Sequence, residues 1–211
     1  MQKKKSEILI QENIRNEDPT TWALPDRAIA RLGRGCEPNM AFSPDGRFIG
    51  IGTLIGIWLY DQETLSPIAL WETEEGVVVS IAFSYDGKWL AASNTNNILK
   101  ILNIENGECL TNVRTDDFIT ELAISQDNRY IAGAYARSSK IDVWETETCK
   151  PIATLYADTG SDGFYRPTLF SPDSKLIVST YRTETTHDED AIAVWNVENG
   201  QQVASLTKHT S

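Results

Sequence analysis

The chain has 211 residues, of which 41% are hydrophobic, and it carries a formal net charge of −11 with a sequence pI near 4.6. This acidic balance disfavours binding to nucleic acid or to an anionic membrane surface, because both are themselves negatively charged. No apolar run approaches the length of a membrane-spanning helix, so the sequence predicts a soluble protein with no membrane partner.

The three cysteines, Cys36, Cys109 and Cys149, lie far apart in the sequence. They form no Cys-x-x-Cys pair, and their odd number does not fit a set of disulfides. We therefore expect free thiols in a reducing compartment and predict a cytoplasmic protein without a zinc site.

At the start of the chain, residues 1–27 are predicted to form an amino-terminal tail, because their short apolar stretch is too small for a secretion signal. Residues 28–32 resemble two later segments, 67–71 and 151–155, that we expect to be fourth strands of sheets. They precede the first complete unit of the repeat described next. We therefore expect residues 28–32 to form an orphan outer strand.

The main feature of the sequence is a phrase that recurs four times, in which an apolar pair is followed by Ser-x-Asp and another apolar run. Its serines are Ser43, Ser84, Ser125 and Ser171, which are separated by 41, 41 and 46 residues. Because these polar residues favour tight turns, each copy predicts a strand, a turn and a second strand. A period near 41 residues is typical of four-stranded propeller blades.

A second phrase recurs in step with the first and predicts a third strand. Its copies are residues 57–61, 99–103, 141–145 and 192–196. Turn signals such as Asn106-Gly107 follow each copy and lead into a fourth apolar strand. The two phrases predict an all-β fold with complete blades at about 36–72, 77–114, 118–156 and 165–207.

Together these phrases resemble the WD-repeat β-propeller family over about residues 28–211. The resemblance implies a β-propeller of four-stranded antiparallel blades, with Tyr60, Trp144 and Trp195 buried between blades. Family members typically link a His, an Asp, a hydroxyl and the third-strand Trp by buried hydrogen bonds, and most of these residues are absent here. We therefore expect apolar packing to hold the blades together.

The resemblance also bears on how many blades the native ring has. In closed propellers, an outer strand from one terminus usually completes the blade that the other terminus begins, which removes open sheet edges. The orphan strand at 28–32, and the likeness of residues 206–211 to the opening of another repeat, favour the first part of a longer propeller. If the 211 residues are complete, two chains could instead form a homodimeric ring of eight blades.

The fourth blade has two insertions, at 157–166 and 181–190, that are longer than their counterparts in the other blades. Strand directions alternate through a blade, so we expect both insertions on one side of the ring. They carry aromatic and arginine residues of the kinds enriched at interfaces, together with several carboxylates. The candidate partner-binding residues are Phe164, Tyr165, Arg166, Tyr181, Arg182, His187 and Asp188. A basic peptide or protein would suit this mixture, and the alternative is that these are tolerated surface insertions.

No motif in the sequence indicates catalysis, because it contains neither a Gly-x-Ser-x-Gly elbow nor a P-loop and has only two histidines. We predict no catalytic residue, cofactor or metal site, and a non-catalytic scaffold for protein–protein interaction. The alternative is a propeller enzyme, or a small-ligand or metal sensor that uses the central channel or the acidic loop at 184–190. A site in the central channel would require polar residues at the starts of the first strands to converge there. The residues at these positions are Asn39, Ser80, Thr120 and Pro167.

Overall fold

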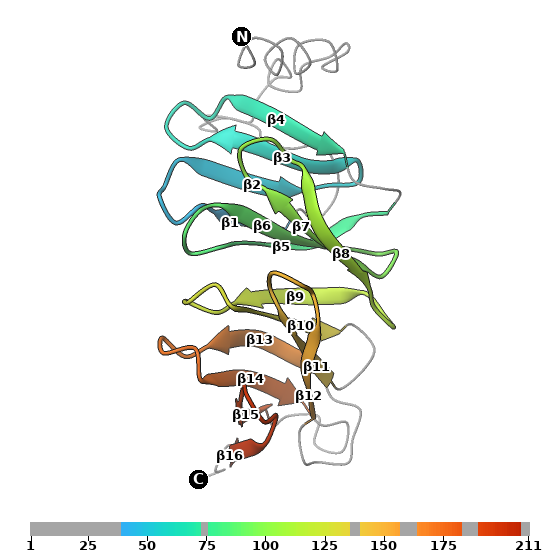
Figure 1. Ribbon diagram of the computed structural model, residues 1–211, viewed down its shortest axis with the longest axis vertical. Helices are drawn as coiled ribbons and strands as arrows, with labels where there is room; N and C mark the ends of the chain where they lie inside the picture. The colour runs from blue at the N-terminus through green and yellow to red at the C-terminus, as the bar shows by residue number, and fades with distance from the viewer. Residues whose placement is uncertain (1–38, 73–75, 136–139, 157–163, 183–189, 208–211) are drawn as a thin grey trace.

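A computed structural model describes residues 39–72, 76–135, 140–156, 164–182 and 190–207 (Figure 1). The regular elements in these ranges are sixteen strands, arranged in four antiparallel sheets of four strands each. Within the described part of the chain, no helix is long and apolar enough to cross a membrane. The predicted all-β fold of four-stranded antiparallel blades is confirmed. The orphan strand expected at 28–32 lies outside the described residues.

Each sheet contains four consecutive strands, which we number as blades 1 to 4. Blade 1 contains β1 (Met40–Phe42), β2 (Phe48–Gly52), β3 (Gly56–Asp61) and β4 (Pro67–Glu72). Blade 2 contains β5 (Val78–Phe83), β6 (Trp89–Asn94), β7 (Ile98–Asn103) and β8 (Cys109–Arg114). Blade 3 contains β9 (Ile119–Ile124), β10 (Tyr130–Tyr135), β11 (Lys140–Glu145) and β12 (Pro151–Tyr156). Blade 4 contains β13 (Phe164–Phe170), β14 (Leu176–Arg182), β15 (Asp190–Asn196) and β16 (Gln202–Thr207).

The Ser-x-Asp turns that join the first and second strands are built alike in all four blades. Each serine Oγ donates to the carboxylate two residues later, at 2.6 to 2.7 Å. The same oxygen accepts a bond from the N–H that begins the second strand, as Ser125 does from Tyr130 at 2.9 Å. The repeated phrase therefore specifies a hydroxyl that fixes both ends of the turn, which explains why the serine recurs.

A second repeated detail follows the third strand. The pairing of the third and fourth strands shifts register at the same position in every blade, next to the third-strand Tyr60, Leu102, Trp144 or Trp195. Five residues later the backbone has a positive φ, at Leu65, Gly107, Cys149 and Gly200. Positive φ suits glycine and strains side-chain-bearing residues, so blades 1 and 3 hold this bulge with residues less suited to it.

The core lies between the blades and is apolar. The predicted burial of the third-strand aromatics is confirmed, since Tyr60, Trp144 and Trp195 are 2%, 4% and 0% exposed. Trp144 packs with side chains of blade 2, and Trp195 packs with side chains of blade 3. Trp195 also donates its indole N–H to the carbonyl of Tyr156 in blade 3, at 3.0 Å.

Polar side chains add links between neighbouring blades at the Ser-x-Asp turns. Asn128 accepts a bond from the N–H of Tyr85 in blade 2 at 2.7 Å, and Ser174 accepts one from the N–H of Asp127 in blade 3 at 3.2 Å. Both residues have φ near 60°, at the position where blades 1 and 2 have Gly46 and Gly87. Blades 3 and 4 thus replace a strain-free glycine by a residue that ties the turn to the preceding blade.

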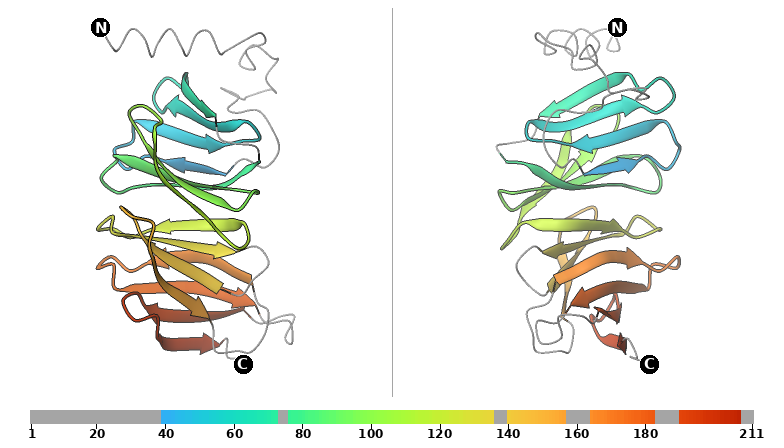
Figure 2. Two further views of the ribbon diagram at one scale, coloured as in Figure 1. Left: turned by 45° about the vertical axis from the view of Figure 1, so that its right-hand side comes forward. Right: turned by 180° about the vertical axis from the view of Figure 1, so that it is seen from behind.

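The four blades follow one another as an arc, with blade 1 at one end and blade 4 at the other (Figures 1 and 2). The first strands β1, β5, β9 and β13 are the strands through which successive blades approach one another. Blades 2 and 3 therefore have a neighbour on both sides. Among the described residues, blades 1 and 4 each have a neighbouring blade on one side.

Candidate functional site

The blades have two edges with different chemistry. Because strand directions alternate, the loop before a first strand and the loop between second and third strands share one edge. We call this edge the loop rim; its described parts are residues 53–56, 76–78, 94–98, 114–119, 135, 140, 164–166 and 181–182. The opposite edge, which carries the Ser-x-Asp turns at 43–46, 84–87, 125–128 and 171–174, is the turn rim.

In blade 1 the loop rim is a tight apolar turn. Thr53 donates its hydroxyl to the carbonyl of Gly56 at 2.9 Å, which holds the turn closed. Gly56 has a φ of 140°, and a Cβ at this position would lie 2.2 Å from the Trp71 carbonyl oxygen. The turn leaves Leu54 and Ile55 about half exposed, so blade 1 presents a small apolar surface at this rim.

Between blades 2 and 3 the loop rim is polar and acidic. Thr115 donates its hydroxyl to the carbonyls of Asn97 and Asp117, at 3.1 and 2.7 Å. Asp117 accepts a bond from the N–H of Phe118 at 2.8 Å. The side chain of Asp116 is 88% exposed. These bonds fix the loop that leads into blade 3 and leave the Asp116 carboxylate facing solvent.

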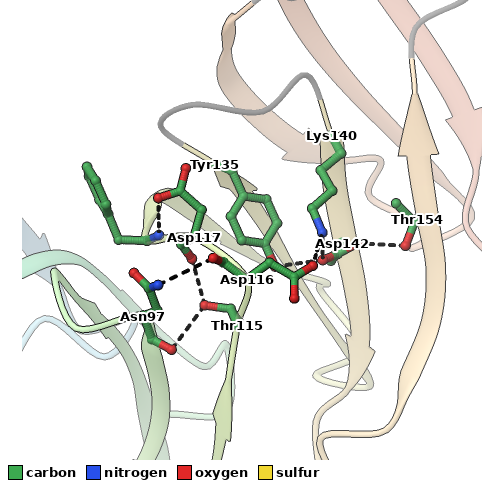
Figure 3. Close-up of polar contacts among 9 residues, drawn as sticks. Asn97, Thr115, Asp116, Asp117, Tyr135, Lys140, Asp142 and Thr154 are labelled. Atoms are coloured by element: carbon green, nitrogen blue, oxygen red, sulfur yellow. Dashed lines mark hydrogen bonds and ion pairs between the residues drawn. The ribbon is translucent and has the colours of Figure 1, made fainter.

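A charged network extends from this loop into blade 3 (Figure 3). Lys140 contacts the carboxylates of Asp116 and Asp142, at 2.9 and 3.1 Å, and lies over the ring of Tyr135. The Asp142 carboxylate accepts a hydrogen bond from the hydroxyl of Tyr135 at 2.6 Å and another from the hydroxyl of Thr154 at 2.7 Å. The network joins the loop between blades 2 and 3 to three strands of blade 3, and it was not predicted from the sequence.

The surroundings of Tyr135 and Lys140 keep both side chains protonated. Burial and the hydrogen bond to Asp142 raise the pKa of Tyr135 far above its ordinary value, so the phenol keeps its proton. Burial would lower the pKa of Lys140, but its bonds to Asp116 and Asp142 outweigh that effect and raise the pKa. A phenol and an ammonium that stay protonated at neutral pH provide neither a base nor a nucleophile.

One signal in the sequence could have indicated this network. Lys140 and Asp142 flank Ile141 at the start of the third-strand phrase of blade 3. At the position of Asp142, the fourth blade has Ala193, which is fully buried. A carboxylate at a position that can be buried requires donors nearby, and Tyr135 and Thr154 supply them from neighbouring strands.

In blade 4 the structure corrects the predicted loops. Phe164, Tyr165 and Arg166 belong to β13 instead of a loop, and Tyr181 and Arg182 belong to β14. Their backbones pair, with Phe164 opposite Arg182 and Tyr165 opposite Tyr181. The first and second strands of this blade are therefore extended at the loop rim.

The pairing between β13 and β14 shifts register between Tyr165 and Thr168, a stretch that contains Pro167. Proline lacks the N–H that a strand ladder needs, so a bulge at this point has a direct cause. The extended ends bring four of the predicted residues together along the backbone. Arg166 follows Tyr165 in β13. His187 and Asp188 lie outside the described residues, as does most of the acidic loop at 184–190.

The polar residues at the starts of the first strands are engaged in contacts of the fold. Asn39 accepts a bond from the N–H of Ile81 in the next blade, and Ser80 accepts one from the N–H of Leu122, each at 3.1 Å. Thr120 donates to the carbonyl of Ala134 at 3.3 Å. Within the ranges given above, no group of three or more His, Cys, Asp or Glu side chains is placed to hold a metal ion. These observations give no support to a site in the channel.

The sequence is similar to those of known proteins, including a WD40 domain family and a WD repeat-containing protein. The family model of the anaphase-promoting complex subunit 4 WD40 domain matches residues 64–127. An uncharacterized WD repeat-containing protein of Synechocystis sp. is 26% identical over 149 residues, which are 69% of this chain and 40% of that protein. Autophagy-related protein 18 of Vanderwaltozyma polyspora is 35% identical over 78 residues, which are 35% of this chain and 14% of that protein.

Two solved structures share the fold. Hydrazine synthase of Kuenenia stuttgartiensis superposes with a TM-score of 0.74 at 18% identity, over 89% of this chain and 53% of that one. The β-propeller domain of Cps50 (Swd1) from Myceliophteria thermophila superposes with a TM-score of 0.70 at 11% identity, over 84% of this chain and 59% of that one. The chain thus spans less than half of each relative matched by sequence and little more than half of each of these structures.

Proposed function

We propose that this chain, a member of the WD-repeat β-propeller family, is a non-catalytic scaffold that binds a basic protein or peptide at its loop rim. The observation that carries the proposal is the contrast between the rims. All four blades build the same turn at the turn rim, whereas the loop rim is an apolar turn in blade 1, a charged network between blades 2 and 3, and an extended hairpin in blade 4. Function tends to reside in such variable segments on a rigid frame.

The charge of the loop rim supports a basic partner. Asp116 is exposed at the junction of blades 2 and 3, and Lys140, the cation beside it, is already paired with two carboxylates. The partner-binding residues that we propose in blade 4 are Phe164, Tyr165, Arg166, Tyr181, Arg182, His187 and Asp188. The whole-chain charge of −11 would attract a basic partner from a distance.

The absence of catalysis is part of the proposal. The polar network at the loop rim holds a phenol and an ammonium in their protonated forms. Asp142 already accepts bonds from Tyr135, Thr154 and Lys140. Such a network positions a loop, and an exposed loop that is held in one conformation binds a partner at a lower entropic cost.

A peptide selection tests the proposal. A library of random peptides displayed on phage is selected on the immobilised protein, and the enriched sequences are compared with the input library. We expect enrichment of Lys and Arg. The affinity of a selected peptide should fall about 10-fold or more in the double variant Tyr165→Ala with Tyr181→Ala, because aromatic anchors dominate interfaces.

Tyr85 provides the matched control, because it is a tyrosine that is 53% exposed on the turn rim. The variant Tyr85→Ala should bind the selected peptide as the unaltered protein does. Equal losses in this control and in the loop-rim variant would contradict the proposed site. Enrichment of acidic peptides would contradict the proposed partner chemistry.

A further inference from the structure

The positive-φ residue that follows each third strand packs against the fourth strand of the preceding blade. In blade 4 this residue is Gly200, and a Cβ built on it would lie 3.4 Å from the Cβ of Ala153 in β12 of blade 3. In blade 2 it is Gly107, where an added Cβ would meet the ring of Trp71 in β4 of blade 1. The repeat therefore brings the same two positions together at each of these junctions.

At the junction of blades 2 and 3, the positive-φ residue is Cys149. Cys149 is 6% exposed and belongs to the apolar cluster that contains Ile101 of β7 in blade 2. Ile101 pairs with Thr111 of β8, and the strand register makes Thr111 the equivalent of Ala153. Cys149 thus lies against the outer strand of blade 2, beside Thr111.

A second thiol lies on the same face of that strand. Cys109 precedes Thr111 by two residues in β8, and alternate residues of a strand share a face. The Cys109 thiol donates to the carbonyl oxygen of Thr111 at 3.4 Å, so its side chain leans along the strand toward Thr111. Cys109 is exposed, Cys149 is buried, and both thiols are free.

The surroundings of Cys149 include both Thr111 and Cys109. Burial raises the pKa of the Cys149 thiol, a hydrogen bond with the Thr111 side chain opposes this rise, and the neighbouring Cys109 adds to it. The two sulfur atoms are therefore close enough for the charge of one to act on the other. Their exposure gives them different access to reagents, because solvent reaches Cys109 and the packed blades cover Cys149.

The neighbouring junctions have no sulfur at these two positions. The equivalents of Cys109 and Cys149 are Pro67 and Gly107 between blades 1 and 2, and Pro151 and Gly200 between blades 3 and 4. Two of the three cysteines of the chain thus occupy the facing positions of one junction. The blade repeat requires a cysteine at neither position.

We propose that Cys109 and Cys149 form an oxidation-sensitive dithiol, which hydrogen peroxide converts into a disulfide that links blade 2 to blade 3. The Cys109 thiolate attacks one peroxide oxygen, so that an S–O bond forms, the O–O bond breaks, and hydroxide leaves and is protonated to water. The Cys149 sulfur then attacks the sulfur of the Cys109 sulfenic acid. The S–S bond forms, the S–O bond breaks, and the hydroxyl group leaves with the Cys149 proton as a second water. The two thiols lose two electrons in total, and the peroxide gains them.

The fold allows the approach that this bond requires. A disulfide brings the two Cβ atoms to about 4 Å from each other. Strand β8 is the outermost strand of its sheet and pairs with β7 alone, and Cys109 is its first residue. A small movement at the start of this strand therefore leaves the rest of the sheet intact.

Peptide mapping after peroxide treatment is the first test. The full chain carries Cys36→Ser, so that Cys109 and Cys149 are its remaining thiols. Both thiols should disappear together, with a mass lower by two hydrogen atoms, and dithiothreitol should restore them. Trypsin cleaves between the cysteines, after Arg114, Arg129 and Lys140, so the disulfide should join two separate peptides. Links between two chains, or irreversible oxidation of Cys109 alone, would contradict the proposal.

Two single variants separate the roles of the thiols. In Cys149→Ser, Cys109 should stop at the sulfenic acid, which dimedone traps. In Cys109→Ser, oxidation of Cys149 should slow by about 10-fold or more, because the buried thiol has little access to peroxide. Circular dichroism establishes that both variants fold. Equal oxidation rates for Cys149 with and without Cys109 would show that Cys109 does not react first.

Leu110 provides the matched control, because it follows Cys109, is 53% exposed, and lies on the opposite face of β8. The variant Cys109→Ser with Leu110→Cys moves the exposed thiol by one residue. This thiol should react with peroxide but should form at least 10-fold less disulfide with Cys149. Equal disulfide yields from positions 109 and 110 would overturn the proposal, because any exposed thiol on this strand would then suffice.

Discussion

At the turn rim, Ser43, Ser84, Ser125 and Ser171 make the same pair of hydrogen bonds in all four blades. At the loop rim the blades differ: blade 1 presents Leu54 and Ile55, the junction of blades 2 and 3 presents a network of charges, and blade 4 extends its first hairpin. The two rims are edges of the same sheets. The comparison shows that the repeat preserves the residues that build the blade and leaves the opposite edge free to vary.

A substitution in the apolar core between the blades should have the largest effect on stability. Trp144→Ala should lower the free energy of unfolding by about 3–5 kcal/mol, because it removes a buried ring and leaves a cavity. Trp144 is 4% exposed and packs with side chains of blade 2. Urea denaturation measures this loss. A change below about 1 kcal/mol would contradict the assignment of the third-strand aromatic as a core residue.

A turn-rim serine should give the next largest effect. Ser125→Ala removes the fully buried hydroxyl that bonds both Asp127 and the Tyr130 N–H. The buried N–H loses its acceptor, so unfolding should cost about 1–3 kcal/mol less. Denaturation curves measure the loss, and peptide binding at the loop rim should be unchanged. Weaker binding by a folded Ser125→Ala variant would contradict the claim that the turn rim serves stability and the loop rim serves binding.

Low pH should lower the stability of the fold through the carboxylates of the turn rim. The hydrogen bond from Ser43, followed by those from Arg47, lowers the pKa of Asp45 from 3.8 to about 2, and Ser171 and the N–H of Lys175 lower the pKa of Asp173. A lowered folded-state pKa stabilises the fold fully above the unfolded value, and this stabilisation is lost as the pH falls toward the folded value. The melting temperature should therefore decrease between about pH 4 and pH 2.

The variant Ser43→Ala isolates this acid effect. Without the hydroxyl, the pKa of Asp45 should return toward its ordinary value, and the decrease in melting temperature between about pH 4 and pH 2 should be smaller. Thermal unfolding of both proteins across this range makes the comparison. An equal acid dependence in the variant would show that the Ser43 bond does not set the pKa of Asp45.

The loop rim should give the smallest effect on stability. Asp116→Asn should change the free energy of unfolding by no more than about 0.5 kcal/mol, because the Asp116 side chain is exposed and Lys140 keeps its ion pair with Asp142. The Asp116 side chain is 88% exposed, and its carboxylate pairs with Lys140. The same denaturation assay measures this. A loss as large as that of Ser125→Ala would show that the loop rim also serves to hold the blades together.

The sequence predicted those features that recur in it. The Ser-x-Asp phrase and the third-strand phrase located the strands and the buried Tyr60, Trp144 and Trp195, because each repeats with a fixed period. The charged network of Tyr135, Lys140 and Asp142 was missed because it occurs in one blade and its members meet only across strands.

The extent of the two loops in blade 4 was predicted wrongly for a related reason. Loop lengths in blade 4 correctly indicated that something differs at this edge, but they did not indicate that strand pairing continues to Phe164 and Arg182. The residue at which a strand ends depends on whether its backbone pairs with the neighbouring strand. Composition alone does not predict this pairing. The binding role of these residues stays a prediction.

Hydrogen–deuterium exchange with a selected peptide tests the claim that the two rims have separate roles. The peptide is one enriched by the display experiment, and exchange of backbone amides is compared with and without it. We predict slower exchange at residues 53–56, 114–119, 164–166 and 181–182 on the loop rim, with no change at residues 43–47, 84–88 and 125–129 on the turn rim. Slower exchange confined to the turn rim would contradict the account.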